Sequence, residues 1–594
     1  MLSEILFLLK KKKGDMRMKE KVIVATVLTM ILIGTMTSVL PIMASPDPIK
    51  IAVVGPQGWI QWDGMWVGAK MAQEKINNGG GILGHPVELI PVDEHAAETP
   101  PNPVAGWAEL LTALEAGAQF VVGGFRTECV SYMRDEFVAY AKAKEMASEP
   151  APLWFIAGAS TDELIDCGYP TGHPLACGKC VRCDYNKYKY MFRVTPMNST
   201  MLFKQFAMFL RTYILPTRLA RMYGNYTGIT IPVTPEHPFE EPVYYPPVKT
   251  YIVAEDLSWT VVMGACLAGK DFVPWSPYPT PPNVSSVLGP NCRVVGYART
   301  HPVTPDFLPI FTDIDAQGVH LIIHIFSAGT GIDFIKMWHD RNTKAICVGI
   351  NVPSQMQEFW DSVGGKCEYE TFLATVGTNT SIIPGVTDAL WDEYKAKSGT
   401  ILTEWYGVPT PSTYPIYTFW GTYDAIMAID ESIESYGSWP ILAPQLIPHT
   451  EKTNRQATIG RFRYTGTNGT LHDVFCDVYS LTKYWPPPQY VRALIVQWQA
   501  GSPGKMQVVW PQDKSYSRRF QIPPVMYNIT TDLNYDGKVD MKDIGPAAKA
   551  FGSFPGHIRW NIEVDLNCDG KVDMKDIGAV AKAFGQKIEP WPLP

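Results

Sequence analysis

The chain has 594 residues, a formal net charge of −7, 46% hydrophobic residues and 18% charged residues. That length predicts several domains with large cores, and the composition excludes a disordered chain. The mild acidity gives no reason to expect nucleic acid as a partner.

Residues 1–44 predict an export signal or a membrane anchor. A positively charged region is followed by Val22 to Ala44, which carry no charge; the region contains Lys10 to Lys13, Arg17, Lys19 and Lys21. An apolar run of this length fits a signal peptide cleaved after Ala44, and it also fits an uncleaved anchor that spans a bilayer. Both readings place the mature chain outside the cytoplasm.

Strand-like and helix-like segments then alternate along the chain. The apolar run 48–56 predicts a buried strand, and a helix follows with apolar residues at helical spacing, at Met65, Ala69, Ala72 and Ile76. Further strands are expected at 86–92, 120–124, 154–158, 250–253 and 320–326, with a second helix at 105–115. This alternation predicts an α/β fold with parallel sheets covered by helices. Residues 45–525 are too many for one such sheet, so two lobes are expected.

Four cysteines gather in one short segment, DCGYPTGHPLACGKCVRCDY, at Cys167, Cys177, Cys180 and Cys183. Outside the cytoplasm, two disulfides that staple a surface insertion are the expected state. The alternative is a zinc ion or an iron–sulfur cluster held by four thiolates. Sequence spacing does not decide between these states.

The loops after the predicted strands are the expected ligand site, because open α/β sheets bind ligands at the carboxyl ends of their strands. These loops contain Trp62, Thr127, Ser160, Trp259, Ser327 and Asn351. Hydroxyls and helix N-termini suit a carboxylate or another anion, and tryptophans suit a flat or apolar body. Taken alone, each tryptophan is better explained by core packing and each hydroxyl by helix capping, but their joint position at strand ends favours a ligand site.

The segment IKIAVVGPQGWIQWDGMWVGAKMAQEKINNGGGILGHPVELIPVDE resembles the opening of type 1 periplasmic binding proteins of the leucine/isoleucine/valine-binding kind. The resemblance continues through VVGG at 121–124 and FIAGASTDEL at 155–164, and more weakly from about 245 to 475. It implies two Rossmann-like lobes joined by three crossovers, with the ligand between lobes that close by a hinge motion.

The resemblance also implies site residues. A ligand carboxylate would contact the first lobe at Trp62, Thr127, Gly158 and Ser160, and the remaining positions fall on Trp259, Ser327 and Tyr423. The family's acidic residue, which binds an α-ammonium, falls on Asn351, and an amide cannot neutralise a buried ammonium. The replacements considered are Glu128, Asp256 and Asp424, and an amide ligand is the alternative. The sequence contains no recognisable catalytic triad or metalloenzyme motif, so no enzyme activity is expected.

A twelve-residue acidic loop occurs twice near the C-terminus, at 532–543 and 565–576. Calcium takes oxygens from positions 1, 3, 5, 7, 9 and 12 of such a loop. The expected ligands are Asp532, Asn534, Asp536, the Lys538 carbonyl, Asp540 and Asp543, and then Asp565, Asn567, Asp569, the Lys571 carbonyl, Asp573 and Asp576. A short amphipathic helix is expected after each loop, with apolar residues at Ile544, Ala548 and Phe551, and at Ile577, Ala581 and Phe584.

A calcium loop with a helix only behind it, and Asp at position 12, resembles the dockerin module. The resemblance covers residues 526–594 and implies a small all-α domain that binds a cohesin-like partner. The usual Ser/Thr contact pair is replaced by Met541 and Lys542, and by Met574 and Lys575.

The leading hypothesis is an exported solute-binding protein that delivers a small amino-acid-like or amide solute to an ABC permease and is tethered by its tail. The alternatives are a surface sensory or scaffold protein of the same fold, and a cohesin-associated component of polysaccharide degradation.

Overall fold

The computed structural model describes residues 46–587 with gaps. The gaps are 99, 170–175, 195–197, 221–224, 232–240, 258–287 (within which 260, 263, 264 and 267 are described), 303–304, 328, 376, 379–381, 476–492, 501–504, 512–516, 522–530, 535–537, 555–556 and 567–570. The predicted signal or anchor at 1–44 and the predicted site residue Trp259 lie outside the described residues. No described helix is long and apolar enough to cross a membrane.

The first lobe is built on a five-stranded parallel sheet in the order β2-β1-β3-β4-β5. Its strands are β1 (Ile49–Gly55), β2 (Val87–Asp93), β3 (Phe120–Gly123), β4 (Leu153–Ile156) and β5 (Met191–Arg193). The three central strands are almost entirely buried, which explains their continuous apolar runs, because helices cover both faces of such a sheet. The strands predicted at 48–56, 86–92, 120–124 and 154–158 are therefore confirmed, within one to two residues at their ends.

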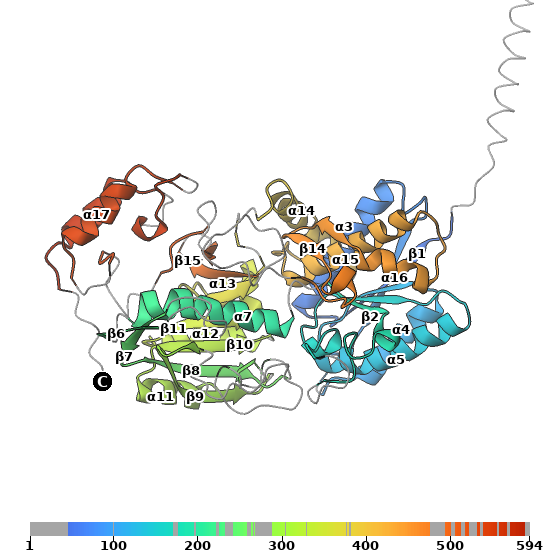
Figure 1. Ribbon diagram of the computed structural model, residues 1–594, viewed down its shortest axis with the longest axis horizontal. Helices are drawn as coiled ribbons and strands as arrows, with labels where there is room; N and C mark the ends of the chain where they lie inside the picture. The colour runs from blue at the N-terminus through green and yellow to red at the C-terminus, as the bar shows by residue number, and fades with distance from the viewer. Residues whose placement is uncertain are drawn as a thin grey trace, which may run out of the picture. The chain divides into compact units, whose positions relative to one another are not determined.

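Helices cover both faces of the first sheet, with α3, α15 and α16 on one side and α4 and α5 on the other (Figure 1). Their bounds are α3 (Ile60–Asn78), α4 (Pro103–Glu115), α5 (Thr127–Met146), α6 (Tyr185–Tyr188), α15 (Tyr417–Tyr436) and α16 (Ala443–Glu451), with a 3-10 turn η1 (Asp162–Leu164). Helix α4 begins at Pro103, and the Asn102 side chain caps it by accepting a hydrogen bond from the Ala105 backbone N–H. Helix α15 packs along α3, although the two are separated by more than 300 residues.

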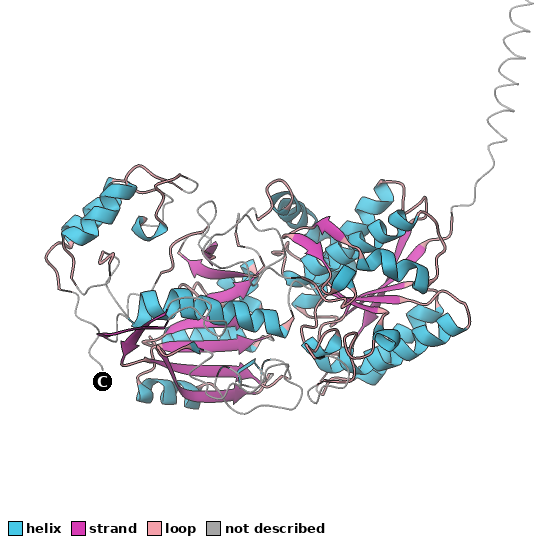
Figure 2. Cartoon of the chain, viewed as in Figure 1, coloured by secondary structure: helices cyan, strands magenta, loops and turns pink. Residues whose placement is uncertain are grey.

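The second lobe is built on a seven-stranded sheet in the order β16-β15-β12-β11-β10-β8-β9 (Figure 2). Its strands are β8 (Val248–Glu255), β9 (Cys292–Thr300), β10 (Leu321–Phe326), β11 (Ile346–Asn351), β12 (Thr371–Ala374), β15 (Leu494–Gln499) and β16 (Lys505–Trp510). The first five run parallel, while β15 and β16 are antiparallel to their neighbours. The strands predicted at 250–253 and 320–326 are confirmed as β8 and β10.

The remaining elements belong to the second lobe and to the connections. They are α7 (Ser199–Phe209), the π-helical η2 (Leu210–Leu219), α11 (Leu308–Gln317), α12 (Thr330–Asp340), η3 (Pro353–Gln355), α13 (Gln357–Ser362), α14 (Thr387–Tyr406) and η4 (Thr467–Gly469), with two small antiparallel pairs, β6 (Asn225–Ile231) with β7 (Glu241–Tyr245) and β13 (Asn454–Gln456) with β14 (Arg461–Arg463).

The chain passes between the lobes three times, after β5, after β12 and after β14. A buried ion pair joins the first and third passages, because Arg193 Nε lies 3.1 Å from Asp473 Oδ1 and both side chains are at most 1% exposed. The Asn198 amide donates to Asp473 Oδ2 at 2.9 Å. The predicted arrangement of two lobes and three crossovers is therefore confirmed, and its connections are tied by paired charges.

The C-terminal region contains α17 (Met541–Ala550), the 3-10 turn η5 (Ile562–Val564) and α18 (Met574–Lys582). They enclose a small core of Ala547, Ala550, Trp560, Val564 and Val572. The predicted helices are present, and of the predicted apolar residues Ile577 packs against this core and Ile544 is half-buried, but the later positions of each face are wrong. Ala548 and Phe551 are exposed, because the helix buries Ala547 and Ala550 against the core. The second copy differs in the same way, since Ala581 and Phe584 are exposed and Val580 is buried.

Candidate functional site

The first predicted site residue, Trp62, lies in the first turn of α3, directly after the loop that follows β1. Its side chain is fully buried, and its ring stacks on Trp66 with centroids 5.4 Å apart. Trp405 of α14 packs against both rings. The Trp62 indole Nε1 has no hydrogen-bond partner. The residue thus forms part of an aromatic cluster and also holds an unused donor.

The loop after β3 is fixed by a buried carboxylate. Glu94, which follows β2, is 0% exposed and accepts hydrogen bonds from the backbone N–H groups of Phe125 (2.8 Å) and Arg126 (3.0 Å). Burial raises the pKa of Glu94 to about 7, against the opposing effect of these two N–H groups. Glu94 therefore positions the N-terminus of α5, where the predicted site residue Thr127 begins the helix.

Thr127, Gly158 and Ser160 are brought together at the carboxyl ends of β3 and β4. The Thr127 and Thr161 hydroxyls lie 2.7 Å apart, and the Ser160 carbonyl accepts a hydrogen bond from the Ser199 hydroxyl. A side chain at Gly158 would place its Cβ 2.6 Å from the Gly124 carbonyl oxygen, so glycine permits the two loops to touch. Sequence reasoning grouped these residues correctly in space, while their role toward a ligand stays a prediction.

In the second lobe, Glu255 at the end of β8 organises the loop after β10. Glu255 is 0% exposed, and its carboxylate accepts hydrogen bonds from the Ser327 backbone N–H (2.8 Å) and hydroxyl (3.0 Å) and from the Thr330 hydroxyl. The Ser327 hydroxyl is therefore engaged with the protein. The Ser327 carbonyl faces the first lobe instead.

Asn351 ends β11 and is fully buried. Its amide Nδ2 donates to Glu370 Oε1 at 2.8 Å, whereas its Oδ1 has no hydrogen-bond partner. Gly331 of α12 lies directly beside that oxygen, since a Cβ on Gly331 would be 2.1 Å from it. Asn351 is thus a fixed acceptor in the second lobe, beside the first turn of α12.

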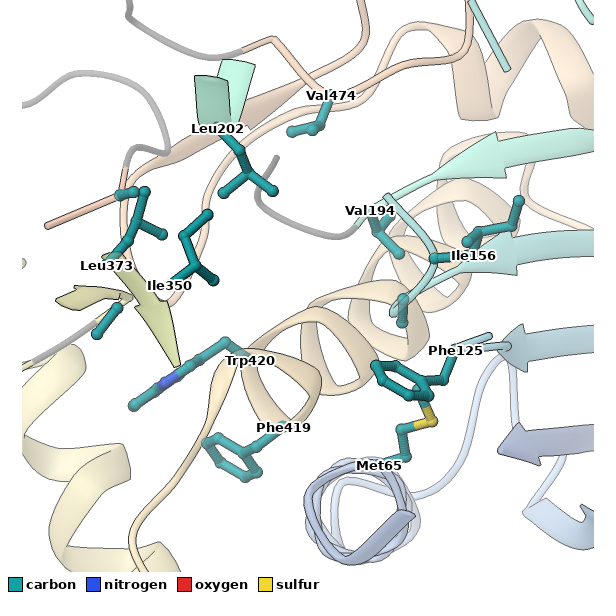
Figure 3. Close-up of a cluster of buried hydrophobic side chains, with 14 of the residues drawn as sticks. Met65, Phe125, Ile156, Val194, Leu202, Ile350, Leu373, Phe419, Trp420 and Val474 are labelled. Carbon is teal, nitrogen blue, oxygen red and sulfur yellow. The ribbon is translucent and has the colours of Figure 1, made fainter. Parts of the chain in front are cut away.

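The two lobes touch at these carboxyl-end loops. Gln61 of α3 donates its side-chain amide to the Ser327 carbonyl across 3.2 Å, and the Thr418 hydroxyl donates to the Gln61 carbonyl at 3.0 Å. Figure 3 shows buried apolar side chains from both lobes gathered around the start of α15, among them Met65, Phe125, Ile156, Ile350, Leu373, Phe419 and Trp420. The junction between the lobes is therefore a buried, largely apolar environment.

Several buried polar atoms near this junction have no hydrogen-bond partner in the described part of the chain. The set contains three acceptors or hydroxyls and two indole donors: Gln61 Oε1, Asn351 Oδ1, Thr375 Oγ1, Trp62 Nε1 and Trp420 Nε1. Unpartnered buried polar groups are rare in native proteins, and each marks a place where water or a ligand completes the hydrogen bonding. The set thus defines a candidate site with both donors and acceptors.

An acidic and aromatic group was missed by the sequence reasoning. Burial raises the pKa of Asp63 on α3, although a hydrogen bond from the Tyr406 hydroxyl (2.5 Å) opposes the shift. Burial also raises the pKa of Glu358 on α13, and the charge of Asp63 adds to that effect. Trp405 lies beside Tyr406 and next to Trp62. Asp63 directly follows Trp62, so a carboxylate next to a predicted site aromatic was the available signal.

The other carboxylates considered in place of the family's acidic residue are engaged elsewhere. Asp424 pairs with Arg455 at 2.8 Å, Asp256 pairs with Arg299, and Glu128 lies 3.3 Å from Arg126. Tyr423 is buried on α15, and its ring lies 5.7 Å from the Lys75 ammonium of α3.

A Cys–His–Glu arrangement lies in the core of the second sheet. His324 Nδ1 is 3.1 Å from the Cys347 sulfur, and its Nε2 is 3.2 Å from Glu370 Oε1. Such an order suits a nucleophile and its base. All three side chains are 0% exposed, so the arrangement offers a substrate no access.

A groove of about 390 Å³ lies at the opposite edge of the first sheet. It is lined by residues at the amino ends of β3 and β4, among them Phe120 and Leu153, together with Trp439 and Pro440. Ligands of parallel sheets bind at the carboxyl ends, so this groove does not belong to the candidate site.

The described residues of the tail's acidic loops include buried carboxylates. Asp543 is 0% exposed, and its two oxygens accept backbone hydrogen bonds from Leu533 (2.8 Å), Asn534 (3.1 Å) and Asp540 (2.8 Å). Asp532, at position 1, is also fully buried. Two carboxylates buried within one twelve-residue loop fit a hard cation that takes oxygen ligands. Asp536, Asn567 and Asp569 lie outside the described residues.

The second loop repeats the first. Asp565 and Asp576 are at most 1% exposed, and Asp576 accepts from the backbone N–H groups of Leu566 (2.7 Å) and Asp573 (2.8 Å). The two loops are also tied to each other's helices in equivalent ways, since Val539 pairs with Gly585 and Gln586 and Val572 pairs with Gly552 and Ser553. The 33-residue repeat is thus a structural repeat.

No family model matches the chain, and no curated protein matches it in sequence. Solved structures do match. A putative branched-chain amino acid ABC transporter protein from Silicibacter pomeroyi is 15% identical and covers 81% of this chain and 100% of its own, with a TM-score of 0.53. The leucine-, isoleucine-, valine-, threonine- and alanine-binding protein from Brucella ovis is 15% identical, covers 77% of this chain and 94% of its own, and has a TM-score of 0.51.

A solute-binding protein of an ABC transporter from Rhodopseudomonas palustris, solved with 3,4-dihydroxybenzoic acid, is 12% identical and covers 78% of this chain and 96% of its own, with a TM-score of 0.50. Identities this low establish the fold alone. The α/β fold of this chain, with its parallel sheets, matches the type 1 periplasmic binding fold.

Proposed function

We propose that this chain is an extracytoplasmic solute-binding protein that captures a small amino-acid-like or amide solute between its two lobes and delivers it to an ABC permease. The observation that carries this proposal is the meeting of the two lobes at their carboxyl-end loops, where the Gln61 amide reaches the Ser327 carbonyl. Ligands of α/β sheets bind at that edge.

The chemistry of the junction supports the choice of solute. Gln61 Oε1 and Asn351 Oδ1 are buried acceptors without partners, and they suit the N–H groups of an amide or an amine. The Trp62 and Trp420 indoles are unused donors that suit a carboxylate or carbonyl oxygen. The carboxylate that a free α-ammonium needs is supplied on this proposal by Asp63, beside the tryptophan cluster.

The test is a thermal-shift screen of the full chain with amino acids, their amides, short peptides, aromatic acids and sugars. A solute that binds the native state raises Tm. Gln61→Ala should weaken the binding of that solute about tenfold, since a buried hydrogen bond contributes about 1.5 kcal/mol. Gln73→Ala is the matched control, because Gln73 is on the same helix and donates to the Val87 carbonyl at 3.0 Å. It should leave affinity unchanged.

If no solute in the screen shifts Tm while the purified chain turns over a substrate, the binding-protein proposal is wrong. An uptake assay distinguishes a transport function from a sensory function. Cells that lack the chain should fail to import the solute, and normal uptake in such cells would favour the sensory or scaffold reading.

We further propose that the tail binds two calcium ions and docks the protein on a cohesin-like partner. The exposed apolar residues support docking, because they recur at equivalent places of the repeat: Met541 (67% exposed) with Met574 (65%), and Phe551 (40%) with Phe584 (50%). When bound, calcium supplies the positive charge that the buried carboxylates lack. Asp532 and Asp565 would each supply a ligand oxygen at position 1.

Calcium titration of the full chain by calorimetry should show two sites, and the double variant Asp532→Asn and Asp565→Asn should lose both. Asp392→Asn, an exposed substitution on α14, is the control and should keep both. Unchanged stoichiometry in the double variant would contradict the assignment.

A further inference from the structure

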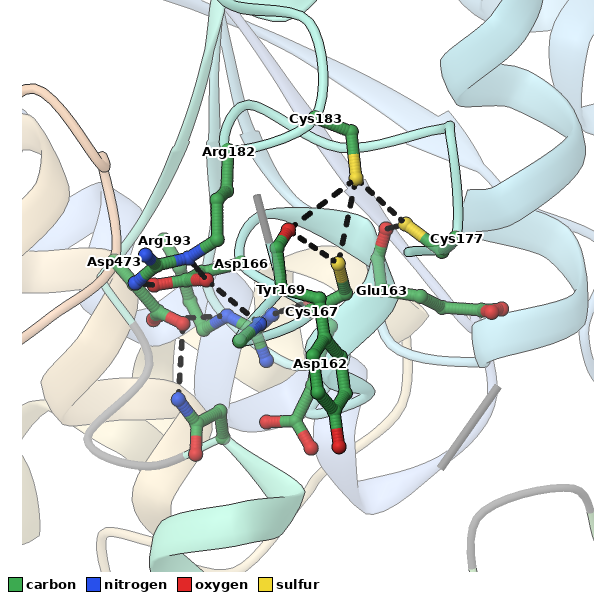
Figure 4. A network of polar contacts seen from close by, with 12 residues as sticks. Asp162, Glu163, Asp166, Cys167, Tyr169, Cys177, Arg182, Cys183, Arg193 and Asp473 are labelled. Atoms are coloured by element: carbon green, nitrogen blue, oxygen red, sulfur yellow. Dashed lines mark hydrogen bonds and ion pairs between the residues drawn. The ribbon is translucent and has the colours of Figure 1, made fainter. Parts of the chain in front are cut away.

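The cysteine cluster of the first lobe is independent of the proposed ligand site and of the tail. Its four sulfurs, from Cys167, Cys177, Cys180 and Cys183, all lie within 4.8 Å of one another, between η1 and α6. The Cys183 sulfur is 3.4 Å from that of Cys167 and 3.8 Å from that of Cys177 (Figure 4). The sulfurs therefore converge on one point.

We propose that these four cysteines bind one Zn²⁺ ion as a tetrahedral tetrathiolate site. A zinc–sulfur bond is about 2.3 Å long, and a tetrahedron with such bonds places its sulfurs about 3.8 Å apart. The separations of 3.4 and 3.8 Å lie close to that value, and all four sulfurs lie within 4.8 Å of one another. Two disulfides would instead draw the sulfurs into pairs about 2.0 Å apart. A four-iron cluster would hold them farther apart, because each cysteine then binds a different iron.

The local backbone is shaped for such a site. Cys177 and Cys180 form a C-x-x-C turn in which Gly178 has φ of +69°, a conformation that glycine adopts without strain. The Lys179 backbone N–H points at the Cys177 sulfur, at 3.4 Å. A backbone N–H directed at a thiolate stabilises its negative charge.

Burial and charge fit a structural ion. Cys167, Cys180 and Cys183 are at most 4% exposed, and Tyr169 packs over them. Four thiolates around one Zn²⁺ leave a net charge of −2. Lys179 and Arg182 lie within the cluster's own sequence, and each also contacts a carboxylate: Arg182 Nη2 donates to Asp166 at 2.8 Å, and Lys179 Nζ lies 3.2 Å from Asp135.

The cluster lies close to the ligand edge of the first lobe. The Cys177 sulfur is 3.9 Å from the Glu163 carbonyl of η1, and Arg134 of α5 donates to that same carbonyl at 3.1 Å. Two residues earlier, the Thr161 hydroxyl contacts Thr127. An ion at the cluster therefore fixes the segment that follows Ser160 and holds it against α5.

Export argues for disulfides, since they persist in oxidising compartments. Zinc binding would protect the cysteines from oxidation, because sulfurs bound to the ion stay thiolates and are shielded by the packing around them. The distinction is measurable on the native chain without any variant.

The metals of the full-length protein are counted by mass spectrometry, which distinguishes zinc from calcium, and the mass of the protein is recorded after denaturation without reductant. The proposal expects one zinc per chain and four cluster cysteines that react with an alkylating agent as soon as the chain is denatured. Cobalt loaded in place of zinc should give the intense sulfur-to-metal absorption of a tetrahedral thiolate site.

Cys180→Ser should lower the zinc content to well below one per chain, while Cys292→Ser, a buried cysteine of β9 that contacts the Thr250 hydroxyl at 3.1 Å, should keep it. If Cys180→Ser does not fold, the metal count and the alkylation of the native chain still distinguish a zinc site from disulfides. Two disulfides among these cysteines, or stoichiometric iron in place of zinc, would overturn the proposal. Neither result bears on solute binding.

Discussion

Ionisation of Glu94 should make the stability of the first lobe depend on pH. The pKa of Glu94 is about 7 in the folded chain, against 4.5 for an unperturbed glutamate, because the carboxyl is fully buried. Between pH 4.5 and pH 7, Glu94 loses its proton in the unfolded chain but keeps it in the folded chain. Stability is therefore full below pH 4.5 and falls as pH rises through 7.

The magnitude follows from the shift. Each pH unit in this window costs about 1.4 kcal/mol, so the whole window costs about 3 kcal/mol. A two-lobed unit of roughly 470 residues unfolds with an entropy on the order of 1 kcal/mol/K, so this cost corresponds to about 3 °C in Tm.

Glu94→Gln removes the ionisable group and keeps the side-chain shape. At pH 4 the variant should be less stable than the wild type by about 1 kcal/mol, because its amide NH₂ faces one of the N–H groups of Phe125 and Arg126. At pH 8 that deficit should be reversed or abolished, since only the wild type then carries a buried charge.

The assay is scanning calorimetry of both proteins from pH 4 to pH 8. The quantity of interest is the difference between their Tm values, in which the other titrating groups cancel. Glu88→Gln, an exposed substitution on β2, is the control and should show a pH-independent difference. A Glu94→Gln difference that stays constant within about 1 °C over this range would refute the reasoning.

Gly123→Ala should destabilise the chain by more than about 2 kcal/mol, because Gly123 has φ of +107° and its added Cβ would lie 2.1 Å from the Val54 carbonyl oxygen. Gly58→Ala is the control and should cost only about 1 kcal/mol, because Gly58 has φ of +86° but open space around it. Equal losses of unfolding free energy in urea denaturation would contradict the packing argument. Asp473→Asn should cost about 3 to 5 kcal/mol, because it leaves the buried Arg193 guanidinium without a counter-charge, and a loss below about 1 kcal/mol by the same assay would show that the pair is dispensable.

Local patterns were enough to predict four of the five strands of the first lobe and its helices α3 and α4, but not β5, α5, α15 or α16. Continuous apolar runs marked β1 and β3 because both faces of these strands are covered, and helical spacing from Met65 to Ile76 marked α3. The repeated acidic loops were equally visible, since the pattern expected of a twelve-residue calcium loop lies within one short segment. In the tail helices the pattern failed by one position, because Ala548 is no less apolar than Ala547 and only the packing decides between them.

The candidate site was predictable only in outline. Thr127, Gly158 and Ser160 could be grouped because the ends of parallel strands meet at one edge. The roles of other residues depended on partners far along the chain, which no local pattern reveals. Asp63 meets Tyr406 more than 300 residues later, and Asn351 is held by Glu370, which directly precedes β12.

The sequence by itself thus determined the alternation of strands and helices, the α/β class and the acidic repeat of this protein, because periodicity and turn residues act over a few positions. The tertiary structure alone decided that α15 packs on α3, that Gln61 reaches Ser327 across the lobes, and that four cysteine sulfurs converge on one point. The physical reason is the same in each case. In each case the residues involved are far apart in the sequence or depend on distant partners, and only the folded chain brings their surfaces together. The local sequence of one segment does not specify where its partner will lie.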